Sequence, residues 1–94
     1  MKVSTFSHDQ EFQVCLGKFL REKRRAKGLT QKQVGQSLNY SSSQFVSLWE
    51  RGHAFPPLET IKKLIELYDL DTDELLRFYE VHLRRILREQ CEPC

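Results

Sequence analysis

Hydrogen-bonding side chains are concentrated in one short stretch of this chain, residues 41 to 47. Three consecutive serines are followed by Gln44, and Ser47 comes one helical turn later. A glutamine amide carries both donors and an acceptor, and a serine hydroxyl can serve either kind of partner. This chemistry suits recognition of the polar edge of another molecule rather than the making or breaking of bonds.

Residues typical of catalytic or metal sites are sparse. The sequence has no phosphate-cradling glycine loop and no nucleophile elbow, and His8, His53 and His82 lack a metal-ligand spacing. The exception is the pair Cys91-x-x-Cys94, but a structural zinc site needs about four ligands. We therefore predict no enzyme activity, no metal and no other cofactor. We interpret the cysteine pair as incidental, with a metal shared between two chains as the alternative.

Charge is distributed unevenly along the chain. The formal net charge of +2 is too small to indicate a polyanionic partner. Residues 18 to 53, however, hold eight bases and two acids, whereas residues 59 to 80 hold three bases and seven acids. A cationic half and an acidic half favour docking on a polyanion in one orientation. Solvated helix faces are the alternative interpretation.

Length and composition limit the classes of protein that remain. Ninety-four residues predict a single domain over 1–94, with a modest core and no room for a deep catalytic cleft. No apolar run spans a bilayer and the first residues do not resemble a secretion signal, so we expect a cytoplasmic protein. Three cysteines, an odd number, favour reduced thiols, with Cys15 as a small core residue.

The first helix is predicted over residues 8 to 27. Ser7 and Gln10 have the capping-box spacing, and Gly28 is a typical stop. One face is apolar and forms the first wall of the core; it consists of Phe12, Leu16, Phe19 and Leu20.

A second, short helix is predicted over about residues 31 to 38. Thr30 and Gln33 again have the capping-box spacing. Gly35 lies in its interior, where glycine is less favourable than alanine by about 1 kcal/mol. That penalty indicates a packing reason, namely the close crossing of two helices.

The third helix is predicted over about residues 42 to 51, after a polar turn at residues 39 to 42. One of the three serines is expected to cap it, and Gly52 ends it. Its inward positions are predicted at helical spacing, namely Phe45, Val46 and Trp49.

Two further helices follow, over about residues 58 to 69 and 72 to 90. Pro57 fits the entry to the fourth, and either Asp71 or Thr72 can cap the fifth. The fourth has a buried stripe that is predicted to contain Leu58, Ile61, Leu64, Ile65 and Tyr68. The fifth is unusually long, and Leu76, Tyr79, Leu83 and Ile86 alternate at spacings of three and four, as in a two-helix seam.

Several of these residues resemble the helix-turn-helix core of the lambda Cro/repressor-like (XRE) family. The likeness covers about residues 16 to 76 and is carried by Thr30-Gln31, Ser47 and Glu50-Arg51-Gly52. It implies an all-α, lambda-repressor-like domain. The helical pattern that continues beyond residue 76 adds an extended C-terminal helix, so we predict five helices in all. The stretch from Leu38 to Gly52 is one residue longer than the usual pattern, which leaves the first residue of the third helix open.

The resemblance also implies roles for individual residues. The third helix would enter the DNA major groove, with base contacts from Ser42, Ser43, Gln44, Ser47 and Leu48. Gln31 matches the family position that holds a phosphate at the start of the second helix. From their charge and position we expect further phosphate contacts from Arg24, Arg25, Lys27, Lys32 and Arg51, with solvated side chains as the alternative. Glu50 would be structural because its charge repels phosphate, and Trp49 would belong to the core.

These expectations define a sequence-specific DNA-binding transcriptional regulator, with repression by operator occupancy as the simplest mode. The expected partner is double-stranded DNA with an inverted-repeat operator, bound by a homodimer; no membrane or small-molecule substrate is indicated. Dimerisation is assigned to Tyr79, Leu83, Ile86 and Leu87, with core burial as the alternative for the last three. The rival function is a protein-interaction module, antitoxin-like or an adaptor, that uses the same fold.

Overall fold

The computed structural model describes the backbone of residues 8–91 and the side chains of residues 11–88. It contains α1 (His8–Ala26), α2 (Gln31–Ser37), α3 (Gln44–Glu50), α4 (Leu58–Tyr68) and α5 (Thr72–Cys91). Within this part of the chain there is no strand, so the all-α prediction is confirmed. None of the described helices combines the length and the apolar character needed to cross a bilayer.

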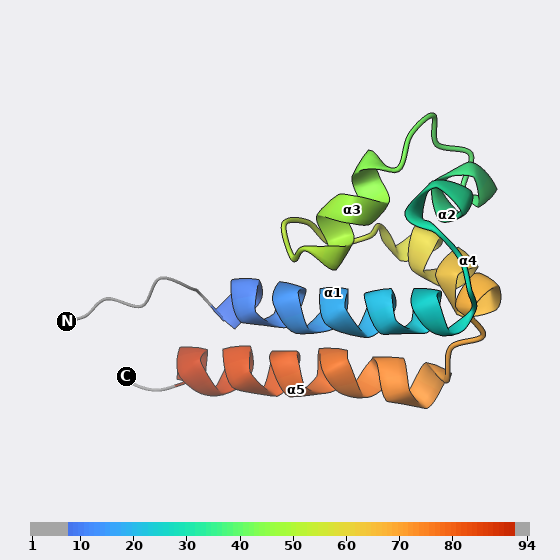
Figure 1. Cartoon of the computed structure of the whole chain (residues 1–94). Helices are drawn as coiled ribbons and strands as arrows, with labels where there is room; N and C mark the ends of the chain where they lie inside the picture. The colour runs from blue at the N-terminus through green and yellow to red at the C-terminus, as the bar shows by residue number, and fades with distance from the viewer. Residues whose placement is uncertain (1–7, 92–94) are drawn as a thin grey trace.

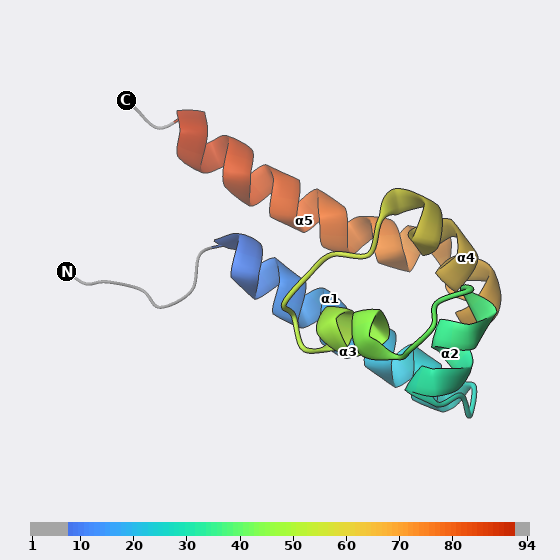
Figure 2. The same cartoon turned by 90° about the horizontal axis from the view of Figure 1, so that it is seen from above.

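The helix α1 is the centre of the arrangement. Figures 1 and 2 show α5 running antiparallel beside α1, while α3 lies on another side of α1 and α2 and α4 gather near its C-terminal end. Helices α3 and α5 therefore pack against different faces of α1.

One hydrophobic core joins all five helices. Leu16, Leu20, Val34, Val46 and Leu64 are its most completely buried large side chains. Each such side chain stabilises the fold by about 1.5–3 kcal/mol relative to an exposed position. The remaining buried apolar residues are Phe12, Phe19, Leu38, Trp49, Ile61, Tyr68, Leu70 and Leu75.

Local capping signals in the sequence are reproduced at two helix starts. At α2, the Thr30 hydroxyl accepts from the Gln33 N–H at 3.0 Å and the Gln33 side chain accepts from the Thr30 N–H at 2.9 Å, which confirms the capping box. At α5, the Asp71 carboxylate accepts from the Asp73 N–H at 3.0 Å, so Asp71 rather than Thr72 caps the helix. The capping box expected at Ser7 lies outside the described residues, as does the side chain of Cys91 and all of Cys94.

Two core assignments outside the third helix were wrong. Leu58 is 78% exposed because it is the first residue of α4 and lies beyond the layer formed by Ile61 and Leu64. Cys15 is exposed because the turn of α1 that brings Phe12 and Leu16 inward leaves position 15 on the edge between α1 and α5.

Candidate nucleic-acid interface

A close backbone approach sets the angle between α2 and α3. A Cβ atom at Gly35 would lie 2.8 Å from the carbonyl oxygen of Ser42 and 3.5 Å from the Cα of Ser43. Side-chain carbon atoms essentially never come so near to a backbone oxygen, so a glycine lets the turn fold against α2. The packing reason inferred for Gly35 is confirmed, although the neighbour is the segment that enters α3 rather than α3 itself.

The helix α3 begins at Gln44, two residues later than expected. Asn39 has a left-handed backbone with φ of 66°, and the chain then bends through the serines instead of entering the helix at once. Ser43 occupies the N-cap position without a side-chain capping bond, while the Ser42 hydroxyl accepts from the Gln44 N–H at 3.2 Å. The extra residue of this turn is thus accommodated before α3.

The expected base-contacting residues lie on the outer side of α3 and the turn before it. Ser42 and Gln44 are exposed, and Ser43, Ser47 and Leu48 are half-buried. Val46 and Trp49, on the opposite side, are buried in the core. Gln44 is therefore exposed at the first turn of α3.

Phe45 corrects the interior pattern predicted for α3. It was expected to face the core, but it is 50% exposed and its ring packs against Tyr40 at a centroid distance of 5.1 Å. The short seven-residue α3 turns only Val46, Trp49 and Glu50 fully inward. A half-exposed aromatic ring, packed against Tyr40, therefore lies next to Gln44. Helical spacing alone could not distinguish this position from a core position.

A buried ion pair joins α1 to α3 beneath this surface. Arg24 donates from Nε to Glu50 Oε2 at 2.6 Å and from Nη2 to Glu50 Oε1 at 3.1 Å. Arg24 also donates from Nη1 to the Leu29 carbonyl at 2.8 Å. The hydrogen bonding to Glu50 raises the pKa of Arg24 above its usual value, against the opposing effect of burial. The structural role expected of Glu50 is confirmed, since its side chain is buried and fully engaged.

The same network alters the assignment of two phosphate contacts. Arg24 is only 8% exposed and donates to Glu50 and to the Leu29 carbonyl, so its burial argues against the phosphate contact expected of it. A long charged side chain on α1 suggested an accessible cation, but this one turns inward to neutralise Glu50. Gln31 is half-buried at the start of α2 and donates from Nε2 to Glu50 Oε1 at 2.9 Å, which places it at the edge of the same network.

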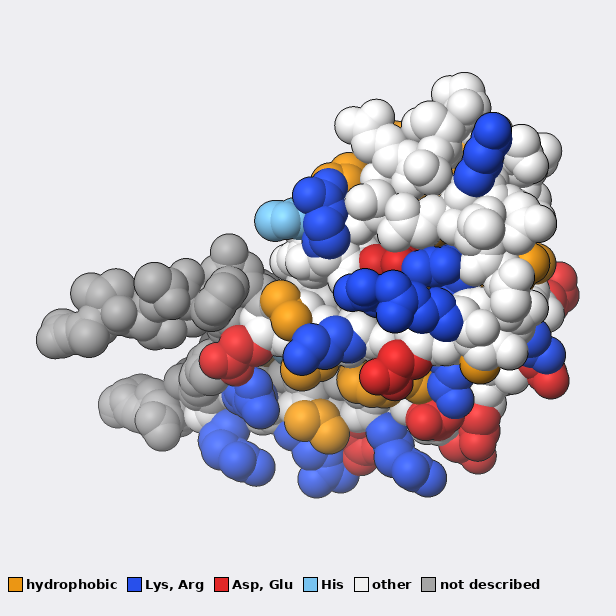
Figure 3. Space-filling model, viewed as in Figure 1, with side chains coloured by type: hydrophobic (Ala, Val, Ile, Leu, Met, Phe, Trp, Pro, Cys, Tyr) orange, Lys and Arg blue, Asp and Glu red, His pale blue; other side chains and the backbone are white. Residues whose placement is uncertain are grey.

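The remaining expected cations stay accessible around α3. Arg25, Lys32 and Arg51 are exposed, and among the described residues no acid pairs with them. Lys27 is also exposed, although its Nζ lies 3.6 Å from Asp69 Oδ2. Arg21, one helical turn before Arg25, is exposed too and was not singled out from the sequence. Figure 3 shows Lys and Arg side chains at the edges of the α3 region and along the adjoining part of α1, with a few acidic side chains among them, while most of the α3 region itself is uncharged.

The dimerisation residues assigned to α5 divide into inward and outward positions. Tyr79 packs edge-on against Phe12 at 5.0 Å, and burial raises the pKa of its hydroxyl. Ile86 is half-buried, whereas Leu83 and Leu87 are largely exposed. Tyr79 is therefore engaged within the domain, because it lies on the side of α5 that turns toward α1.

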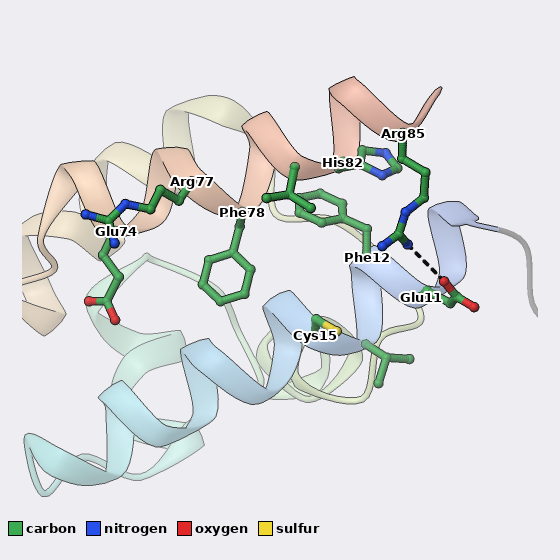
Figure 4. A pocket seen from close by; sticks show the side chains of 10 residues that line it. Glu11, Phe12, Cys15, Glu74, Arg77, Phe78, His82 and Arg85 are labelled. Atoms are coloured by element: carbon green, nitrogen blue, oxygen red, sulfur yellow. Dashed lines mark hydrogen bonds and ion pairs between the residues drawn. The ribbon is translucent and has the colours of Figure 1, made fainter. Parts of the chain in front are cut away.

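A separate apolar groove lies between α1 and α5. It has a volume of about 700 Å³ and is lined in part by Phe12, Cys15, Phe78 and Val81. Figure 4 shows Arg85 closing one end through its bond to Glu11, with Nη1–Oε1 at 3.0 Å. The ring of His82 stacks on Phe12 at 4.3 Å. All of the lining residues come from α1 and α5, so none belongs to the surface around α3.

Comparison with known proteins places this geometry in a family. The family profile described as "Helix-turn-helix domain" matches residues 16–78. The chain belongs to the helix-turn-helix family. The start of the match at residue 16 agrees with the resemblance inferred from the sequence, and its end at residue 78 falls two residues later.

Two curated relatives share this helix-turn-helix domain. The chain is 41% identical over 68 residues to the HTH-type transcriptional regulator ImmR of Bacillus subtilis, covering 72% of this chain and 53% of that protein. It is 37% identical over 57 residues to the HTH-type transcriptional activator BcrR of Enterococcus faecalis, covering 61% of this chain and 28% of that protein. The chain thus spans about half the length of the first and about a quarter of the second. No solved structure matches it.

Proposed function

We propose that this chain binds double-stranded DNA as a transcription regulator, with α3 in the major groove. The observation that carries the proposal is the exposed Gln44 on the outer side of α3, next to accessible cations and above the buried Arg24–Glu50 pair. Both curated relatives are named as transcriptional regulators, which supports the same conclusion. A cytoplasmic location fits this role.

Base recognition is assigned first to Gln44. An exposed glutamine amide at the first turn of α3 can form two hydrogen bonds with the N6 and N7 edge of adenine. Ser42, Ser43 and Ser47 would supply single hydrogen bonds, and Leu48 would contact a thymine methyl group. To these we add Phe45, whose half-exposed ring offers a second apolar contact for thymine.

Phosphate contacts are assigned to four exposed cations and to Gln31. Arg25, Lys27, Lys32 and Arg51 are exposed, and Gln31 stands at the start of α2. Glu50 would act indirectly, because its contacts to Arg24 and Gln31 fix the two helices that carry this set. Contacts to phosphate position a protein on the duplex, while base contacts specify the sequence.

We further propose that two copies act together on an inverted repeat, through the exposed leucines of α5. A twofold pair presents two α3 helices to half-sites about one DNA turn apart or a multiple of it. Repression by occupying the operator is the mode that requires the fewest additional parts. One of the relatives is named as a transcriptional activator, so activation is the alternative to repression. Transcription in vitro with and without the protein distinguishes the two modes.

A direct test is titration of fluorescent duplex DNA with the full chain at low salt, followed by fluorescence anisotropy. The proposal predicts saturable binding that weakens steeply as salt rises, because each neutralised phosphate releases counterions. Absence of binding to any duplex at low salt would contradict it and favour the protein-interaction role.

A further inference from the structure

Two ion pairs between α1 and α5 bound the apolar groove at its ends. Arg85 bonds to Glu11 at 3.0 Å, and Lys23 Nζ lies 3.4 Å from Glu74 Oε1. Figure 4 shows Glu74 and the Arg85–Glu11 bond toward opposite ends of the groove. Between the two ion pairs α1 advances by twelve residues and α5 by eleven, which is about 17 Å along either helix axis. The groove is therefore about three helical turns long.

The phenyl rings that line the groove are held by neighbours outside it. Phe78 packs against Phe19 at 4.7 Å between ring centroids, and Phe12 packs against Phe55 at 5.4 Å. Neither Phe19 nor Phe55 belongs to the lining. Phe12 and Phe78 would lose these contacts if they turned to fill the groove. The space is therefore preformed, which lowers the cost of ordering when a ligand binds.

The lining leaves apolar surface in contact with solvent. Cys15 is exposed and Val81 is 57% exposed, although both line the groove. Covering such surface with another apolar group is favourable, because it removes that surface from water. The rings of Phe12 and Phe78 add a preference for an aromatic occupant, since aromatic groups stack or pack edge to face with one another.

Charged residues that line the groove balance one another. They are two acids and two bases, namely Glu11, Glu74, Arg77 and Arg85. Glu11 pairs with Arg85 across one end of the groove, and Glu74 pairs with Lys23 across the other. A charged occupant would have to compete with these pairs for its counter-charge.

Arg77 is the remaining charge, and carboxylates lie beside it. No ion pair holds it within the part of the chain that the structure describes. However, Asp73, Glu74 and Glu80 lie three or four positions from it, on the same side of α5. An anionic group at Arg77 would therefore lie near three carboxylates as well as one guanidinium. This charge pattern favours an uncharged occupant over an anion of the same shape.

We infer that the groove between α1 and α5 binds an uncharged, largely aromatic small molecule, which lies along the groove in contact with Phe12 and Phe78. The volume of about 700 Å³ is in the range of sites that hold ligands of drug size. The groove is separate from the surface around α3, so the inference does not rest on the DNA-binding proposal.

The experiment is a fluorescence titration of N-phenyl-1-naphthylamine, an uncharged aromatic probe, with the full chain under reducing conditions and without DNA. We expect saturable binding of a single probe per chain, with a dissociation constant of about 1–100 µM. Cys15→Trp and Val81→Trp should each raise this constant about tenfold or more, because the indole takes up space in the groove. Leu83→Trp places the same side chain at an exposed position of α5 outside the lining and should leave the constant within about twofold.

The charge preference is tested with 8-anilinonaphthalene-1-sulfonate, which has the same rings and an added sulfonate. It should bind to the groove at least about fivefold more weakly than the uncharged probe, because the sulfonate loses hydration beside three carboxylates. Binding as tight as that of the uncharged probe would show that Arg77 selects an anion, and would contradict the inference.

Two further results would overturn it. The first is the absence of saturable probe binding at every protein concentration, as when a second copy of the chain covers the groove. The second is an equal effect of Leu83→Trp and of the two groove substitutions. Circular dichroism checks that each variant stays helical. Should Cys15→Trp lose its fold, Val81→Trp decides, because position 81 is largely exposed.

Discussion

Arg24 of α1 and Glu50 of α3 form a two-pronged buried ion pair, with Nε–Oε2 at 2.6 Å and Nη2–Oε1 at 3.1 Å. Gln31 of α2 joins the same carboxylate at 2.9 Å. Hydrogen bonds to the Glu50 carboxylate thus connect α1, α2 and α3, on the side of α3 opposite its exposed residues. The pair holds the proposed recognition helix at a fixed angle to α1, which carries Arg25.

Removing the carboxylate is expected to destabilise the fold strongly. Glu50→Ala leaves the Arg24 guanidinium buried without a counter-charge, a change of about 3–5 kcal/mol in the free energy of unfolding. Urea unfolding followed by circular dichroism measures it. Glu66→Ala, at an exposed position of α4, is the control and should change stability by no more than about 0.5 kcal/mol. Equal effects of the two substitutions would contradict the role given to Glu50.

Adding one methyl group at Gly35 is expected to disturb the turn before α3. Alanine is favoured over glycine inside a helix by about 1 kcal/mol. At this position the new Cβ would lie 2.8 Å from the Ser42 carbonyl oxygen, so we predict net destabilisation of about 1–3 kcal/mol instead. Thermal unfolding of Gly35→Ala measures it, with the exposed neighbour Gln36→Ala as a control that should be neutral or stabilising. A more stable Gly35→Ala protein would show that the turn can relax.

Whether a contact could be predicted from the sequence depends on how far apart its residues are along the chain. The cap of α2 involves Thr30 and Gln33, three residues apart, and was predicted correctly. Arg24 and Glu50 are 26 positions apart, so the sequence could not distinguish a buried arginine from an accessible one. Gly17 is a similar case, because a Cβ there would lie 2.5 Å from the Trp49 carbonyl oxygen, a contact set only by the crossing of α1 and α3.

The errors on α3 have a related cause. Periodicity assigned Phe45 to the core together with Val46 and Trp49, but α3 buries Val46, Trp49 and Glu50, and Phe45 lies at the edge of that side. Its start could not be fixed either, because three adjacent serines are equivalent as caps in sequence. Only the folded turn shows that the Ser42 hydroxyl takes the Gln44 N–H.

The buried Tyr68 and the half-buried Tyr79 predict loss of stability in alkali. Burial raises the pKa of Tyr68 and of Tyr79 above the ordinary value of about 10. The unfolded chain therefore ionises first, so their contribution to stability is complete below about pH 10 and is lost as pH rises toward the folded-state values. Urea midpoints at pH 9, 10 and 11 should fall less steeply for Tyr68→Phe and Tyr79→Phe than for the original chain. Identical pH profiles for all three would exclude these tyrosines as the cause.

The salt dependence of DNA binding should separate accessible cations from others. Lys32→Gln and Arg51→Gln should each reduce the slope of log affinity against log salt by about 0.9, the value for one phosphate contact. Lys62→Gln removes an equivalent exposed charge on α4 and should leave the slope unchanged. Anisotropy titrations at four salt concentrations provide the slopes. If Lys62→Gln reduced the slope by as much as Lys32→Gln or Arg51→Gln, net charge rather than a position beside α3 would govern DNA binding.

Selection of binding sites from random duplex DNA with the full chain tests the central claim most directly. If α3 reads the major groove, an enriched motif emerges; Gln44→Ala relaxes the preference at one adenine position, and Phe45→Ala relaxes it at a thymine. The exposed substitution Gln36→Ala on α2 should leave the motif unchanged. A pool that stays random at low salt, or a motif that is identical with and without the Gln44 side chain, would contradict the account.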